Sequence, residues 1–157
     1  MSDTIYFIDP SWVGEREFRS DAVVETHDQI RYAFDLVTEL WSLIDENDKA
    51  VQIEKVMNDA CSEAHGVVLK DEDPAKLIEL FSGLRGAVMR AGYVGENHYT
   101  PVDRMDEVRA RTKRVDVGEY RGASAARGIF EAIEKVETLV DLLQRARMLK
   151  LHVMPYG

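Results

Sequence analysis

The stretch I-F-E-A-I-E-K-V-E-T-L-V-D-L-L, residues 129–143, decides the fold class of this chain of 157 residues. Its apolar residues recur at steps of four and three, at Ile129, Ile133, Val136, Val140 and Leu143. This is the period of an α-helix with one apolar face, and such a seam can pack against a neighbouring helix with coiled-coil geometry. We therefore expect a long C-terminal helix over residues 123–148 that begins near Ser124.

The first of three earlier periodic segments begins at a capping box. Thr26 and Gln29 stand three residues apart, so each side chain can satisfy the other's free backbone donor at a helix start. The apolar residues that follow again recur at steps of four and three, at Ile30, Phe34, Val37, Trp41 and Ile44. The sequence therefore predicts a helix that starts at Thr26.

Two more helices are expected in the acidic part of the chain, residues 26–91. The second is predicted to end at Gly66, a plausible C-terminal cap, and to bury an apolar face made of Ile53, Val56, Met57, Ala60, Cys61 and Ala64. The third is predicted to start at Asp73-Pro74, because Asp caps helices well and Pro suits the first helical position. It is expected to run to Gly92, with Gly83 and Gly86 inside it at a close helix contact.

The two ends of the chain have strand-like patterns. Residues 4–8, T-I-Y-F-I, form a β-prone run closed by Asp9-Pro10, and apolar residues alternate over 149–153 before Pro155. These two runs are expected to be short strands that pair with each other. The fold class predicted is mainly α: a single domain over residues 1–157, built as a bundle of about four longer helices, with an α+β arrangement as the alternative.

Composition favours a protein of the cytoplasm. The chain is 45% apolar and 31% charged, it has one cysteine, and its uninterrupted apolar runs are only a few residues long. A disulfide framework, a secretory signal and a membrane-spanning helix are therefore not expected. We predict a cytoplasmic protein that does not enter membranes and needs no cofactor.

Charge is divided unequally between the two halves. Residues 1–80 contain 19 Asp/Glu and 7 Lys/Arg, a balance of −12, whereas residues 81–157 contain 10 Asp/Glu and 13 Lys/Arg, a balance of +3. The basic excess is concentrated between Arg104 and Arg127, where seven Lys/Arg stand against four Asp/Glu, and most of this stretch belongs to residues 92–122, an irregular segment that contains several glycines. Since the whole chain carries a net charge of −9, nucleic acid is an unlikely partner and a basic protein a favourable one.

Two groups of charged residues are candidate binding sites. Asp45, Glu46 and Asp48 cluster at the junction of the first two expected helices, where they would form an acidic surface for a partner. Five arginines form a candidate anion patch, because Arg binds phosphate in a bidentate manner: Arg109, Arg111, Arg114, Arg121 and Arg127. The same arginines could instead pair with the acidic half of this chain or of a second copy.

Catalytic and metal-binding patterns are scarce. The four histidines are far apart in the sequence, which predicts no metal site, and His98 in a polar loop is the one candidate acid or base. Cys61 and His65 stand four residues apart and would share a helix face, but we interpret Cys61 as a small buried apolar residue. These observations favour a protein without enzymatic activity.

The leading functional prediction is a cytoplasmic protein-binding domain, of the kind found in immunity proteins, antitoxins and regulators. It would engage a basic partner through its acidic helices. An alternative is a nucleotide- or RNA-phosphate-binding protein, or a ribonuclease, that uses the segment Arg109–Arg127. A further alternative is a structural subunit of a larger assembly, and self-association would be compatible with any of the three.

Overall fold

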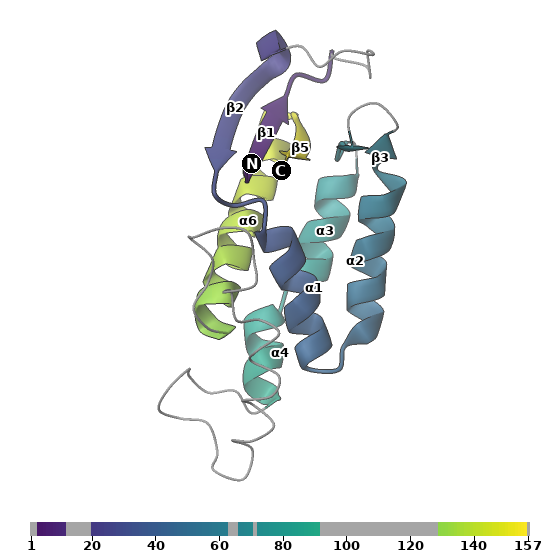
Figure 1. Cartoon of the computed structure of the whole chain (residues 1–157), viewed down its shortest axis with the longest axis vertical. Helices are drawn as coiled ribbons and strands as arrows, with labels where there is room; N and C mark the ends of the chain where they lie inside the picture. Colours follow the sequence, from purple (N-terminus) through teal and green to yellow (C-terminus); the bar gives the residue numbers. More distant parts are fainter. Residues whose placement is uncertain (1–2, 12–19, 63–65, 71, 92–128, 157) are drawn as a thin grey trace.

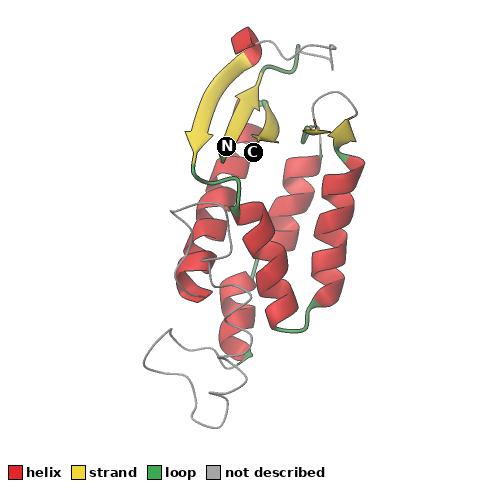
Figure 2. Cartoon of the chain, viewed as in Figure 1, coloured by secondary structure: helices red, strands yellow, loops and turns green. Residues whose placement is uncertain are grey.

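The computed structural model describes residues 3–11, 20–62, 66–70, 72–91 and 129–156. Helices make up most of these residues, and a small antiparallel sheet lies at one end of them (Figures 1 and 2). The elements in chain order are β1 (Thr4–Ile8), η1 (Ser20–Ala22), β2 (Val23–Asp28), α1 (Ala33–Leu43), α2 (Asn47–Asp59), β3 (Cys61–Ser62), β4 (Gly66–Val67), α3 (Asp73–Phe81), α4 (Leu84–Arg90), α6 (Ile129–Leu149) and β5 (His152–Tyr156). The predicted helix-rich fold with short terminal strands is confirmed.

The sheet is formed by the two ends of the chain. Its strand order is β2-β1-β5, and β1 pairs antiparallel with both neighbours. The register with β5 runs from Thr4 opposite Tyr156 to Ile8 opposite His152, so the predicted pairing of the terminal runs is confirmed (Figure 1). Pro155 lies within β5 and does not end it, which is compatible with the position of β5 at the side of the sheet.

The predicted helix start at Thr26 is wrong. Thr26 lies in β2, opposite Tyr6 of β1, and α1 begins only at Ala33. Gln29 follows β2 with a φ of 61°, a left-handed conformation that ends the strand and turns the chain. Pairing with a strand some twenty residues away therefore outweighs the local capping pattern.

The start of α1 is held by Asp3, next to β1. The Asp3 carboxylate accepts a hydrogen bond from the Tyr32 backbone N–H at 2.9 Å, and the Asp3 carbonyl accepts one from the Ile30 N–H at 3.2 Å. Burial raises the pKa of Asp3 and outweighs the bond from Tyr32, which acts in the opposite direction. Burial also raises the pKa of the Tyr32 phenol to about 12, and the carboxylates of Asp3 and Glu131 add to this shift.

The core is centred on α1, which is surrounded by other helices. Seven of its eleven residues are buried, and it packs against α2, α4 and α6. Of the apolar residues predicted for its face, Phe34, Val37 and Trp41 are buried in the core, with Val37 and Trp41 almost inaccessible to solvent. Ile30 and Ile44 lie just outside α1, and Ile44 is only partly buried. The face of α6 is also buried as predicted, at Ile133, Val136 and Leu143, but α6 packs against both α1 and α3 and not against a single neighbour.

The second predicted helix is shorter than expected. α2 ends at Asp59, and Cys61 and Ser62 form the short strand β3, which pairs with Gly66 and Val67 of β4. Gly66 therefore belongs to a strand and does not cap a helix, although its φ of 73° suits glycine. The predicted helix was too long because Ala60 and Cys61 continue the apolar spacing of α2 by chance beyond its end at Asp59.

The third predicted helix is two helices. α3 begins at Asp73-Pro74 as predicted, but it ends at Phe81, and Gly83 with a φ of 78° separates it from α4. An ideal Cβ at Gly83 would meet no atom within 4 Å, and one at Gly86 would meet only the Arg90 side chain. The predicted close helix contact at these glycines is therefore wrong. Gly83 is suited to its position because its backbone is left-handed, a conformation that glycine adopts without strain.

Two further expectations concern the long C-terminal segment and membranes. α6 runs from Ile129 to Leu149, while the predicted start near Ser124 and the irregular basic segment 92–122 lie outside the described residues. No helix in the described ranges combines the length and the apolar character needed to cross a bilayer.

We predict that Asp3→Ala destabilises the fold by about 1–2 kcal/mol, because the Tyr32 N–H loses its acceptor. Asp3→Asn keeps an acceptor oxygen and removes a carboxylate whose charged form burial disfavours. A raised pKa in the folded state means that the stability gained from the protonated form of Asp3 is present below its ordinary pKa of 3.8 and is lost as pH rises. Urea unfolding should therefore show that the stability of Asp3→Asn relative to the wild type increases between about pH 3 and about pH 7. Equal losses for Asn and Ala would show that the charge itself is needed.

The two glycines should respond oppositely to alanine. Gly83→Ala is expected to destabilise by about 1–2 kcal/mol, because the left-handed backbone disfavours a Cβ even where space is free. Gly86→Ala is expected to be neutral or stabilising by up to about 1 kcal/mol, since it lies inside α4 and only the flexible end of Arg90 must move. Urea unfolding of the two variants and the wild type tests this: the midpoints should shift in opposite directions while the m-values stay the same. The reverse order would contradict the separate assignment of α3 and α4.

Candidate functional site

The structure brings the three predicted acidic residues together in one turn. Asp45, Glu46 and Asp48 lie between α1 and the first turn of α2, and all three are exposed. The turn is fixed by backbone bonds, from the Asp45 N–H to the Ser42 carbonyl at 3.1 Å and from the Glu46 N–H to the Trp41 carbonyl at 2.8 Å. We call Asp45, Glu46 and Asp48 the acidic turn.

Local structure explains part of this acidity. Asp45 has a φ of 62°, a conformation that Asp tolerates better than most residues. Glu46 stands at the cap position of α2 and Asp48 in its first turn, where negative charge is favourable because of the helix dipole. The positions therefore have a structural role, and the exposure of the Glu46 and Asp48 side chains leaves these two carboxylates accessible to a partner as well.

A lysine next to the acidic turn is directed onto an aromatic ring. Lys49 Nζ lies 4.3 Å from the centre of the Trp41 ring, a cation–π distance. Trp41 is buried, and its indole Nε1 has no hydrogen-bond partner among the described residues. Glu46 and Asp48 form no ion pair within the ranges that the structure describes, so Lys49 does not neutralise them by direct contact.

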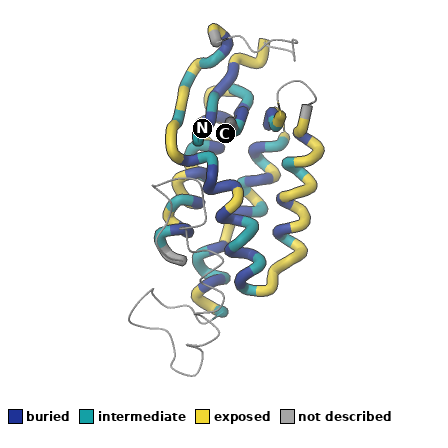
Figure 3. Tube along the Cα trace, viewed as in Figure 1, coloured by how far each residue is buried: buried dark blue, intermediate teal, exposed yellow. Residues whose placement is uncertain are grey.

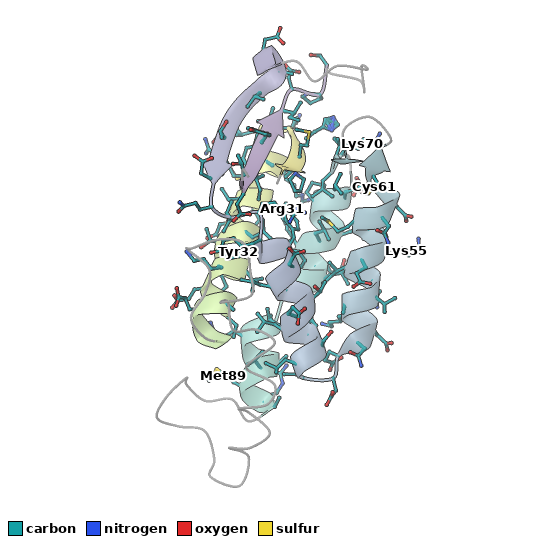
Figure 4. The ribbon with its side chains drawn as sticks, in the orientation of Figure 1. Arg31, Tyr32, Lys55, Cys61, Lys70 and Met89 are labelled. Carbon is teal, nitrogen blue, oxygen red and sulfur yellow. The ribbon has the colours of Figure 1, made fainter. Side chains whose placement is uncertain are left out.

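The acidic turn continues into an exposed helix face. α2 buries only Ala50 and Ile53, and its outer side is exposed along most of its length (Figure 3). Val51, one turn after the acidic turn, is 62% exposed. At the far end, Lys55 and Asp59 form an exposed ion pair at 2.9 Å, which directs the Lys55 charge away from the turn (Figure 4). The face thus combines carboxylates with an exposed apolar side chain.

The other predicted site residues lie outside the described residues. These are the five arginines of the candidate anion patch, Arg109, Arg111, Arg114, Arg121 and Arg127, and the candidate acid or base His98. Their roles therefore remain predictions. Among the described residues, no group of three or more His, Cys, Asp and Glu side chains is arranged to hold a metal ion.

The prediction that Cys61 is buried on a helix face is wrong. Cys61 is an exposed free thiol in β3, beyond the end of α2 (Figure 4). The helical relation expected between Cys61 and His65 therefore does not hold, and His65 itself lies outside the described residues. The reason is the early end of α2, which removes Cys61 from the buried stripe.

Sequence reasoning missed two ion pairs that join distant elements. Arg145 of α6 holds the Glu25 carboxylate of β2 at 2.9 Å, and Arg85 of α4 holds that of Glu137 of α6 at 2.6 Å. In each pair the hydrogen bond from the arginine lowers the pKa of the glutamate. The Arg85 pair stands at a groove of about 330 Å³ with apolar residues from α3, α4 and α6 in its lining. No local pattern in the sequence could have indicated either pair.

His27 is part of the first of these pairs. Its Nε2 lies 3.3 Å from Glu25, and its ring centre lies 4.7 Å from that of Phe7. A carboxylate that already contacts Arg145 and His27 acts as a structural link between β2 and α6 and is not free to bind a ligand.

We predict that Cys61 reacts with a thiol reagent in the native protein almost as fast as after denaturation, because its side chain is exposed. The chain has one cysteine, so the expected stoichiometry is one label per chain without further mutagenesis. Slow labelling in the native state followed by rapid labelling in denaturant would restore the buried assignment.

Comparison with known proteins does not supply a function: no protein-family model matches the chain, and no curated protein or solved structure is similar to it. Function must therefore be inferred from the surfaces described above.

Proposed function

We propose that this chain is a protein-binding domain that engages a basic partner protein through the acidic turn and the adjoining outer face of α2. The observation that carries the proposal is the exposure of Asp45, Glu46 and Asp48 together on one turn fixed by backbone hydrogen bonds. The net charge of −9 adds a long-range potential of the same sign.

The geometry supports rapid, charge-guided association. Carboxylates on an ordered turn do not need to be rearranged before binding, and complementary potential raises association rates more than it raises affinity. Val51 offers apolar contact area next to the charges, at 62% exposure. A basic patch bordered by apolar side chains on the partner would match both features.

Charge reversal at the turn tests the proposal. We expect Glu46→Lys with Asp48→Lys to slow association with the native partner about tenfold or more at low salt, with a smaller effect at high salt. Asp45 is left unchanged because its positive φ would add a backbone strain unrelated to charge. The partner is first obtained by capture from native extract with the wild-type chain, and rates are then measured on the purified pair.

A matched control separates local charge from total charge. Glu134→Lys with Asp141→Lys makes the same change in net charge at exposed positions of α6 and should slow association much less. Arg111→Ala with Arg114→Ala should leave partner binding nearly intact. Equal slowing by the two charge reversals, or loss of binding in the arginine variant, would contradict a role for the acidic turn.

A further inference from the structure

The two outer edges of the sheet differ in how they are covered. The outer edge of β5 is bonded near its start to Leu69, by two backbone hydrogen bonds with Val153 of 2.7 and 2.9 Å. β2 forms the other edge, and β1 is its only strand neighbour among the described elements (Figure 1). No other described strand thus pairs with the backbone on the outer side of β2.

β2 has only part of the usual protection of an edge strand. Natural edges are shielded by proline, lysine, bulges or a short strand length, because an open edge invites another chain to pair. β2 has six residues, V-V-E-T-H-D, without proline or lysine. Its bulge, at Val24, lies near the start of the strand and leaves residues 25–28 in regular register with residues 4–7 of β1. Val24 is 55% exposed on its outward face, next to exposed Thr26.

Charge on this edge selects the kind of chain that can pair with it. Asp28 is exposed and accepts a hydrogen bond from the Thr4 hydroxyl, while Glu25 is held by Arg145 and His27 from within the fold. The nearest other cation along the chain, Arg31, pairs with Asp35 at 3.4 Å. The edge therefore presents the Asp28 carboxylate, which forms no ion pair among the described residues, and the strand itself contains no lysine or arginine.

A second copy of this chain is a poor occupant of the edge. Its β2 would bring a second Asp28 to the interface and no lysine or arginine within the strand to pair with it, so the charges of the two strands would not be complementary. An extended segment with basic residues would place a cation near Asp28 and could place apolar or β-branched side chains opposite Val24 and Thr26. Backbone pairing would supply affinity and the side chains selectivity.

We infer that β2 binds an extended basic segment of a partner protein, which adds to the sheet as a fourth strand. This site is separate from the acidic turn: in Figure 1 β2 lies at the sheet end of the molecule, and the α1–α2 connection lies at the opposite end of the helices. Binding at β2 is therefore independent of binding at the acidic turn.

The first test uses a capped peptide of alternating lysine and valine, long enough to pair with the whole of β2. Hydrogen exchange should slow about tenfold or more at those amides of residues 23–28 that point away from β1 when the peptide binds, because pairing on the outer side protects them. The same peptide with N-methylated backbone amides keeps its charge but cannot complete a strand ladder, and it should give no protection. Equal protection or equal affinity with the methylated peptide would overturn strand addition.

Variants on the exposed face of β2 give a second readout. Val24→Lys should weaken peptide binding several-fold at low salt by charge repulsion, whereas Val24→Thr keeps a β-branched residue and should not. Asp28→Asn keeps an oxygen for the Thr4 hydroxyl and removes the charge, so it too should weaken binding several-fold. Unchanged affinity in both Val24→Lys and Asp28→Asn would overturn the selection for basic segments.

Two controls distinguish the other occupants. Protection of residues 23–28 that appears without peptide as the protein concentration rises would identify a second copy as the occupant and overturn the inference. Glu46→Lys with Asp48→Lys should leave the protection by the peptide unchanged. Loss of that protection in this variant would place the peptide at the acidic turn and would likewise overturn strand addition at β2.

Discussion

Pairing of β1 with strands from both ends of the chain is the constraint on which the described structure depends. Ile5 and Phe7 of β1 are fully buried and contribute to the same core as the helices. β5 follows α6 after a sharp reversal at Lys150, whose φ is 57°, so its pairing with β1 fixes where α6 ends. On the other side, Asp3 fixes where α1 begins. One strand thus positions the first and the last long helix relative to each other.

The sequence is informative where structure is decided locally. The face of α6, with Ile133, Val136 and Leu143, was predictable because an apolar stripe repeated over several turns fits a helix and hardly any other local structure. The start of α1 was not, because Thr26 has a capping pattern and also a pairing partner, Tyr6, that lies twenty residues away. A cross-strand partner cannot be recognised from periodicity, so the periodic pattern gave no sign of the interaction that prevailed.

The same distinction applies to the candidate sites. The acidic turn could be predicted because its three carboxylates lie within four residues, and any connection between two helices would keep them together. The link from Arg145 to Glu25 spans 120 positions, and only the fold brings the two side chains into contact. Cys61 shows the opposite error: a helical spacing continued past the true end of α2, and an exposed thiol was assigned to the core.

The acidic turn and the edge of β2 would act on a partner over different distances. Charge on the turn is felt across roughly 10 Å at 0.1 M salt, so it affects how often a basic partner arrives. Backbone pairing at β2 requires contact along an extended segment, so it affects how long the partner stays. A protein that separates these tasks can keep a fast association rate while the paired segment sets the lifetime. The negative charge near β2 has two effects. It attracts a basic partner, and it disfavours pairing between two copies of this chain.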